Sequence, residues 1–133
     1  MKYSECKTEQ AFKMEWIRRN RKNFTEIFCI ETEETVKGFP DVLTLSENSV
    51  AQFAEFKKAR NGFIHFQSTQ PAFYKAHSNM LISVISLVEN KGKYYVVALP
   101  IQIVMARLKG AMNLDLRPWC IDKTEVENDR SRK

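Results

Sequence analysis

The run Met80–Val88, MLISVISLV, is the most apolar stretch of the chain and constrains its fold more than any other feature. It is short, rich in Ile and Val, and bounded by polar residues, which is typical of a strand buried on both faces of a sheet. A turn over residues 89–93 and a second apolar run, Tyr94–Leu99, predict a neighbouring strand that pairs back. The sequence therefore predicts a central sheet with covering elements on both faces.

Three helices are predicted around this sheet. The first spans residues 8–22, with Thr8 as its N-cap and an apolar face of Phe12, Trp16 and Ile17. The second spans residues 71–79, with Pro71 in its first turn and Phe73 and Ala76 facing inward; the third spans residues 101–109 and ends at Gly110.

Further strands are predicted over residues 24–30 and in a hairpin over residues 38–57, with an acidic turn over 31–35 between them. The apolar piece 63–66 is compatible with a strand or a loop. The fold class that follows is α/β, one central mixed sheet flanked by helices. At 133 residues, the length predicts a single domain over residues 1–121, followed by a charged, frayed tail over 122–133.

The composition limits the classes of function without choosing among them. The chain has no apolar run of about 20 residues and no N-terminal apolar segment, so we expect a cytoplasmic protein without a membrane partner. Three widely spaced cysteines argue against a zinc site or a disulfide framework. The formal net charge of +5 favours polyanionic partners.

The hairpin over residues 38–57 carries charges that a core strand normally avoids. Asp41 follows Pro40 at the entrance of its first strand, and Glu55 and Lys57 lie within the second. Side chains two apart on a strand point the same way, about 6–7 Å apart. If the strands are neighbours, two carboxylates and an ammonium converge among apolar residues, which is costly unless a cation compensates them. We therefore predict a divalent metal site, with an ordinary solvated strand face as the alternative.

These residues, in this order, resemble the PD-(D/E)xK nuclease superfamily. The resemblance is greatest to its small phage-type members, which are the virus-type replication-repair nucleases and the Holliday-junction resolvases. The matching positions cover roughly residues 8–100 and are Glu9, Gly38-x-Pro40-Asp41, Glu55-x-Lys57 and Gln70-x-x-Phe73. The resemblance implies a restriction-endonuclease-like core. It also implies a Mg²⁺-dependent endonuclease that acts on DNA, with branched or Holliday-junction DNA as the favoured substrate.

The resemblance also implies the roles of the strand residues. Asp41, Glu55 and the backbone carbonyl of Phe56 would bind the metal, and Lys57 would orient or stabilise the attacking hydroxide. Carboxylate oxygens without Cys or His suit Mg²⁺, with Mn²⁺ as a substitute, and no small-molecule cofactor is expected.

Two helix positions complete the implied site. Gln70 would support it from the second helix, with Gln67 as the alternative. Glu9 would provide a second-metal or supporting carboxylate, with Glu5 or Glu15 as alternatives.

Basic residues near this site are candidates for contacts with DNA phosphates. For those at the end of the first helix, the alternative is a solvated helix terminus. The candidates are Arg18, Arg19, Arg21, Lys22, Lys58 and Arg60.

Two alternatives to a nuclease remain, a non-catalytic nucleic-acid-binding module that retains the nuclease fold and a basic interaction protein with a coincidental motif. We also expect a homodimer, because resolving a four-way junction requires two related cuts. The apolar residues from 101 onward could form its interface or pack on their own sheet; they are Ile101, Ile103, Val104, Met105, Leu108, Leu114, Leu116 and Trp119.

Overall fold

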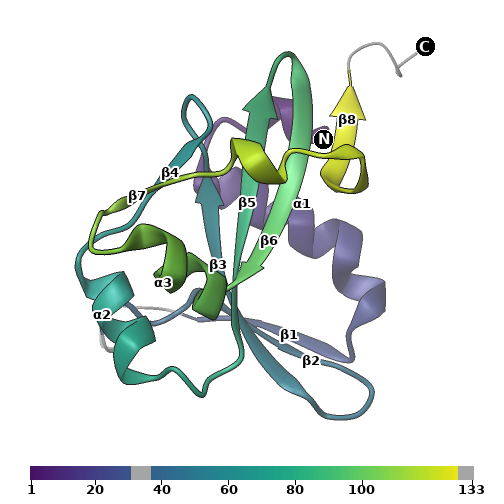
Figure 1. Ribbon diagram of the computed structural model, residues 1–133. Helices are drawn as coiled ribbons and strands as arrows, with labels where there is room; N and C mark the ends of the chain where they lie inside the picture. The colour runs from purple at the N-terminus through teal and green to yellow at the C-terminus, as the bar shows by residue number, and fades with distance from the viewer. Residues whose placement is uncertain (31–36, 129–133) are drawn as a thin grey trace.

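The computed structural model describes residues 1–30 and 37–128, so the acidic turn predicted over 31–35 lies outside the described residues. The protein is an α/β protein with a mixed six-stranded sheet, in the order β1-β2-β3-β5-β6-β8, and a two-stranded sheet of β4 and β7 (Figure 1). The helices are α1 (Glu9–Asn20), α2 (Thr69–Ala76) and α3 (Ile101–Leu108). The strands are β1 (Glu26–Cys29), β2 (Val42–Leu45), β3 (Ala51–Lys58), β4 (Phe63–His65), β5 (Ile82–Asn90), β6 (Lys93–Pro100), β7 (Asn113–Asp115) and β8 (Glu125–Asn128).

The predicted central strand is confirmed as β5. It pairs with β3 in parallel on one side and with β6 in antiparallel on the other. Val84, Leu87 and Val88 are each at most 3% exposed, as expected for a strand covered on both faces. The predicted hairpin of β2 and β3 is also confirmed, with Val42 opposite Ala54.

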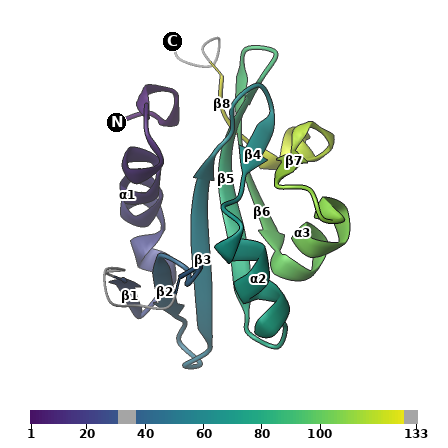
Figure 2. The ribbon, with the colours of Figure 1, turned by 90° about the vertical axis from the view of Figure 1, so that its left-hand side faces the viewer.

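Helices cover the two faces of the sheet separately (Figure 2). On one face, α1 contributes Phe12 and Ile17 to a core that includes Ala54 and Phe56 of β3. On the other face, α2 and α3 pack on a second core built from β5 and β6. Because side chains alternate along a strand, Ala54 and Phe56 facing α1 direct Glu55 toward the side of α2. The buried charges of β3 therefore lie under the N-terminal part of α2.

Three of the expected details are wrong or incomplete. Helix α2 begins at Thr69, two residues early, and buries Tyr74 instead of Ala76, which is exposed. The unassigned piece 63–66 contains β4, which pairs with β7.

The predicted frayed tail is wrong for residues 122–128, because β8 adds to the sheet beside β6. Glu127 of that strand also forms an ion pair with Arg19 at 3.1 Å. These distant partners order a segment whose local composition is only charged; residues 129–133 lie outside the described part.

The apolar residues of α3 pack mainly on their own sheet. Ile101, Val104 and Leu108 are buried in the same core as Leu114 and Leu116. Met105 and Trp119 pack against that core, while Ile103 is 41% exposed. Most of the apolar residues considered for a dimer interface are therefore covered by the protein's own core and cannot contact a second copy. Of the helices within the described ranges, none combines the length and apolar character needed to cross a bilayer.

Candidate active site

The structure brings Asp41, Glu55 and Lys57 together beside the start of β2, at the end of the β2–β3 hairpin that lies away from its turn. Glu55 and Lys57 are each only 6% exposed, although both are charged residue types. Asp41 lies just before β2, and its N–H donates to the Ala54 carbonyl at 3.1 Å. The adjacent strands thus place the two acids side by side, as the sequence predicted.

Gln70, from the first turn of α2, links the two buried charges of β3. Lys57 Nζ donates to Gln70 Oε1 at 2.8 Å, and Gln70 Nε2 donates to Glu55 Oε2 at 3.0 Å. The N–H of Gln67 also donates to Gln70 Oε1, at 3.0 Å. Of the two candidate glutamines, Gln70 is therefore the one whose side chain contacts both Glu55 and Lys57, and Gln67 holds that side chain in place.

A second set of contacts lies along the edge of β3 that extends past Val42, the first residue of β2. The N–H of Phe56 approaches Asp41 Oδ2 at 3.4 Å, and the N–H of Lys58 approaches Glu9 Oε2 at 3.5 Å. Since the N–H and C=O of one strand residue point the same way, the Phe56 carbonyl faces this edge between the two carboxylates. The residue opposite, before Asp41, is Pro40, which has no N–H to donate to the Phe56 carbonyl. The carbonyl is thus placed to bind a cation beside Asp41.

Burial and, next to it, the charge and hydrogen bond of the Asp41 carboxyl group together raise the pKa of Glu55 from 4.5 to about 9. The Lys57 ammonium acts in the opposite direction and lowers it. The same ammonium lies 5.0 Å from the centre of the Phe66 ring, a cation–π contact within the buried region. Without a cation, the buried acid pair therefore holds a proton at neutral pH.

The local sequence explains how Asp41 reaches this position. Gly38 has φ +86°, and a Cβ on it would lie 2.2 Å from the carbonyl oxygen of Thr69. The chain can therefore pass against the start of α2 only with glycine at this position. Phe39 then packs edge-on against Phe53 and Phe73, with ring centres 5.4 and 5.3 Å apart. These contacts fix the segment that leads into Asp41.

The donor set fits a hard divalent cation. Asp41, Glu55 and the Phe56 carbonyl offer only oxygen atoms, as Mg²⁺ prefers. Within residues 1–30 and 37–128, no group of three His, Cys, Asp or Glu is arranged to hold a metal. Two carboxylates and a carbonyl are consistent with Mg²⁺, which usually keeps several waters and binds through one or two carboxylates.

The three candidate acids of the N-terminal region lie in different places. Glu9 lines the same depression as Lys57, at the start of α1. Glu15 is buried and pairs with Arg18 and Arg19, and the hydrogen bonds and charges of Arg18 first and then Arg19 lower the pKa of Glu15 to about 2. The Glu5 side chain accepts from the Lys2 N–H at 2.7 Å. Glu9 is thus the acid that lies beside the candidate site.

The candidate DNA-binding cations also lie in different places, and only some of them are near the candidate site. Lys58 and Arg60 line a depression of about 600 Å³ beside Lys57. Arg18 and Arg19 form the ion pairs with Glu15, so internal partners occupy them. The exposed residues Arg21 and Lys22 follow α1, which has 12 residues and thus places them about 18 Å from Glu9.

Tyr74 is a site residue that the sequence analysis did not single out. It is 1% exposed, and its hydroxyl has no hydrogen-bond partner among the described residues. Burial raises its pKa, and the charges of Glu55 and Asp41 raise it further. Its spacing of four residues from Gln70 puts both on one face of α2, which is the pattern that would have identified it.

No family model matches this chain, and no curated protein matches it, so the arrangement of these residues is the basis for assigning a function.

Proposed function

We propose that this protein is a Mg²⁺-dependent endonuclease that hydrolyses DNA phosphodiester bonds, with branched DNA, including Holliday junctions, as its preferred substrate. The observation that carries the proposal is the chain of hydrogen bonds from Glu55 through Gln70 to Lys57, with Asp41 across from Glu55. A purely structural strand gains nothing from burying this set of charges. The proposal includes a restriction-endonuclease-like core of the PD-(D/E)xK type.

In this mechanism Asp41, Glu55 and the Phe56 carbonyl would hold the cation. The chemistry that Mg²⁺ would supply there is activation of a water at neutral pH and compensation of the charge on the scissile phosphate. Lys57 presents a fixed positive charge to the phosphate oxygens as negative charge develops on them. Gln70 holds Glu55 and Lys57 in register through its two hydrogen bonds, so neither side chain must reorganise during the reaction. Glu9 supplies a further carboxylate at the edge of the same depression.

The DNA backbone is bound next to this centre. Lys58 and Arg60 line the depression that contains Lys57, where they would contact phosphates flanking the scissile bond. Such contacts provide affinity that is independent of sequence and weakens with salt. Recognition of a branch then depends on DNA shape, in keeping with a structure-selective enzyme.

A plasmid-nicking assay tests the proposal. We expect the protein to convert supercoiled plasmid to the nicked form in Mg²⁺ or Mn²⁺, and EDTA to stop the reaction. Asp41→Asn should abolish nicking, whereas Glu47→Gln, an exposed acid in the β2–β3 turn, should retain it. Equal Mg²⁺-dependent nicking by wild type and Asp41→Asn contradicts the assignment. DNA binding by a wild-type protein that never nicks supports the alternative of a non-catalytic binding module.

The working unit is proposed to be a homodimer, because the described residues of one chain offer one such site and symmetric junction cleavage requires two. Light scattering should give about twice the chain mass of 15.6 kDa. A monomer that is equally active on junctions and linear duplex would favour a general or flap-type nuclease over a resolvase.

A further inference from the structure

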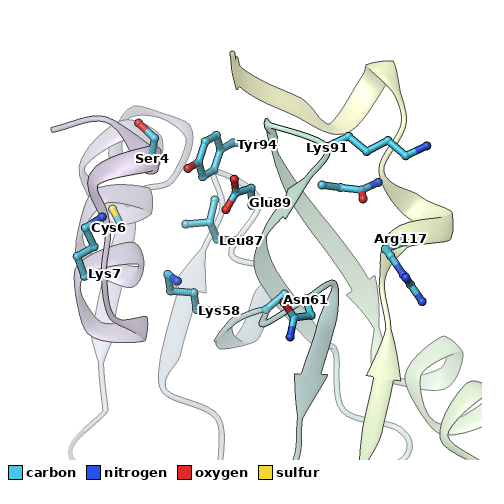
Figure 3. A pocket seen from close by; sticks show the side chains of 12 residues that line it. Ser4, Cys6, Lys7, Lys58, Asn61, Leu87, Glu89, Lys91, Tyr94 and Arg117 are labelled. Carbon is cyan, nitrogen blue, oxygen red and sulfur yellow. The ribbon is translucent and has the colours of Figure 1, made fainter. Parts of the chain in front are cut away.

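A second groove lies beside the turn that follows β3, on the side away from the depression that contains Lys57. It has a volume of about 390 Å³ and runs between the N-terminal segment and the β5–β6 hairpin. Figure 3 shows Lys7 and Lys58 toward one end and Lys91 and Arg117 toward the other. Leu87, Glu89 and Tyr94 lie between these two basic ends, in the middle of the groove.

The lining is basic at its ends. Lys7 and Lys91 are exposed, and neither has an ion-pair partner within the described part of the chain. Lys58 is half-buried and is likewise without an ion pair there. Arg117 is held by Asp115, with Nη2 2.8 Å from Oδ2, so its charge is partly neutralised. The groove thus offers an anion three ammonium groups that form no ion pair within the described residues.

The middle of the groove has a different chemistry. Leu87, which is 3% exposed, forms the floor of the groove, and the partly exposed Tyr94 ring beside it is a surface on which a nucleic-acid base can stack. The Glu89 carboxylate repels a phosphate but accepts hydrogen bonds from the amino group of a base such as cytosine. Cations at both ends with an aromatic ring in the middle match a strand whose phosphates and base faces are both accessible. Paired bases in a duplex are stacked on one another and do not expose their ring faces to a side chain such as Tyr94.

This groove is connected to the candidate active site. Lys58 lines both this groove and the depression that contains Lys57. Only the turn at Arg60–Gly62 separates them, and the Arg117 stem packs against it, with Cγ 2.6 Å from where a Cβ on Gly62 would be. A strand that leaves the site past Lys58 therefore enters the groove directly.

We propose that this groove binds a single-stranded arm of the DNA substrate, next to the point of cleavage. A volume of about 390 Å³ is that of a site for a small ligand, which suits a short stretch of one strand. The inference rests on the proposed nuclease function and refines it: the groove adds affinity for those branched substrates in which one arm is unpaired next to the branch.

Fluorescence anisotropy with a labelled 12-nucleotide single strand and a 12-base-pair duplex tests the inference, with Ca²⁺ in place of Mg²⁺. The double variant Lys7→Ala/Lys91→Ala should bind the single strand more weakly. Its slope of log affinity against log salt should fall by about 1.4, at about 0.7 per lost phosphate contact. Duplex affinity should change much less. The matched control is Lys75→Ala/Lys123→Ala, which removes the same charge from exposed positions outside the groove and should bind both probes as wild type does.

Three outcomes overturn the inference: an unchanged single-strand slope in the groove variant, an equal loss on the two probes, or an equal loss in the control variant. Plasmid nicking by the wild-type protein separates this result from the proposed function. If the wild-type protein nicks plasmid but the groove variant has an unchanged single-strand salt slope, the groove does not bind the strand and the proposed nuclease function stands. A selective single-strand defect without any wild-type nicking supports the groove and refutes the nuclease.

Discussion

The raised pKa of Glu55 makes the stability of the metal-free protein depend on pH in a specific direction. An unfolded chain ionises Glu55 near its ordinary pKa of 4.5, whereas the folded protein keeps the proton until about 9. The folded state therefore binds more protons between these values. The contribution of Glu55 to stability is fully present below about 4.5 and is lost progressively as pH rises toward 9.

The size of the effect follows from the shift. Each pH unit in this window costs about 1.4 kcal/mol, so Glu55 costs about 3 kcal/mol at pH 7. Glu55→Gln removes the titration, while its side-chain oxygen can still accept from Gln70. In EDTA at pH 7, we expect Glu55→Gln to be the more stable protein, by up to about 3 kcal/mol, or roughly 10 °C in Tm. The difference should disappear toward pH 5.

Thermal unfolding of both proteins from pH 5 to 9, in EDTA and in Mg²⁺, checks this prediction. Mg²⁺ should stabilise wild type more than Glu55→Gln, because binding to the folded state adds stability by mass action. Glu47→Gln, at an exposed position, should follow wild type in both conditions. Parallel pH profiles for wild type and Glu55→Gln would refute the reasoning, since they would mean that Glu55 is ionised in the folded protein.

Three further predictions follow from contacts described above. Glu15→Gln should destabilise the protein by about 2 kcal/mol at pH 7, because Arg18 and Arg19 lose their partner, and this cost should vanish as pH falls from 4.5 through about 2; an unchanged urea midpoint at pH 7 would contradict it. Tyr74→Phe should raise stability in EDTA by about 0.5–1 kcal/mol, because it removes a hydroxyl without a partner in the described structure; a loss of more than about 1 kcal/mol would show that the hydroxyl is hydrogen-bonded. Neutralising Lys58 and Arg60 together should reduce the salt slope of duplex binding, measured in Ca²⁺, by about two units, and an unchanged slope would return them to an ordinary solvated surface.

Local patterns in the sequence were enough to predict the part of the site carried by strands. The two-residue spacing of Glu55 and Lys57 fixes a common side, and Asp41 at a strand entrance needs only a hairpin to meet them. The central strand was equally predictable, because Met80–Val88 is too short for a buried helix and too apolar for a surface strand.

What could not be predicted depends on contacts between distant segments. The choice of Gln70 over Gln67 depends on where α2 begins and which side chain turns toward β3. Arg19, which pairs with Glu15, also pairs with Glu127, more than 100 residues away. The same long-range contacts convert the charged tail into β8. No local pattern contains this information, because each segment alone has the charged composition of a solvated surface.

The most direct test of the central claim is single-turnover cleavage of an end-labelled four-way junction at saturating protein. The account predicts cleavage in Mg²⁺ but not in Ca²⁺, a rate lowered at least 100-fold by Asp41→Asn and by Lys57→Ala, and a wild-type rate for Glu47→Gln. Circular dichroism of the same preparations controls for folding. Cleavage by folded Asp41→Asn protein at the wild-type rate, or in the presence of EDTA, would contradict it.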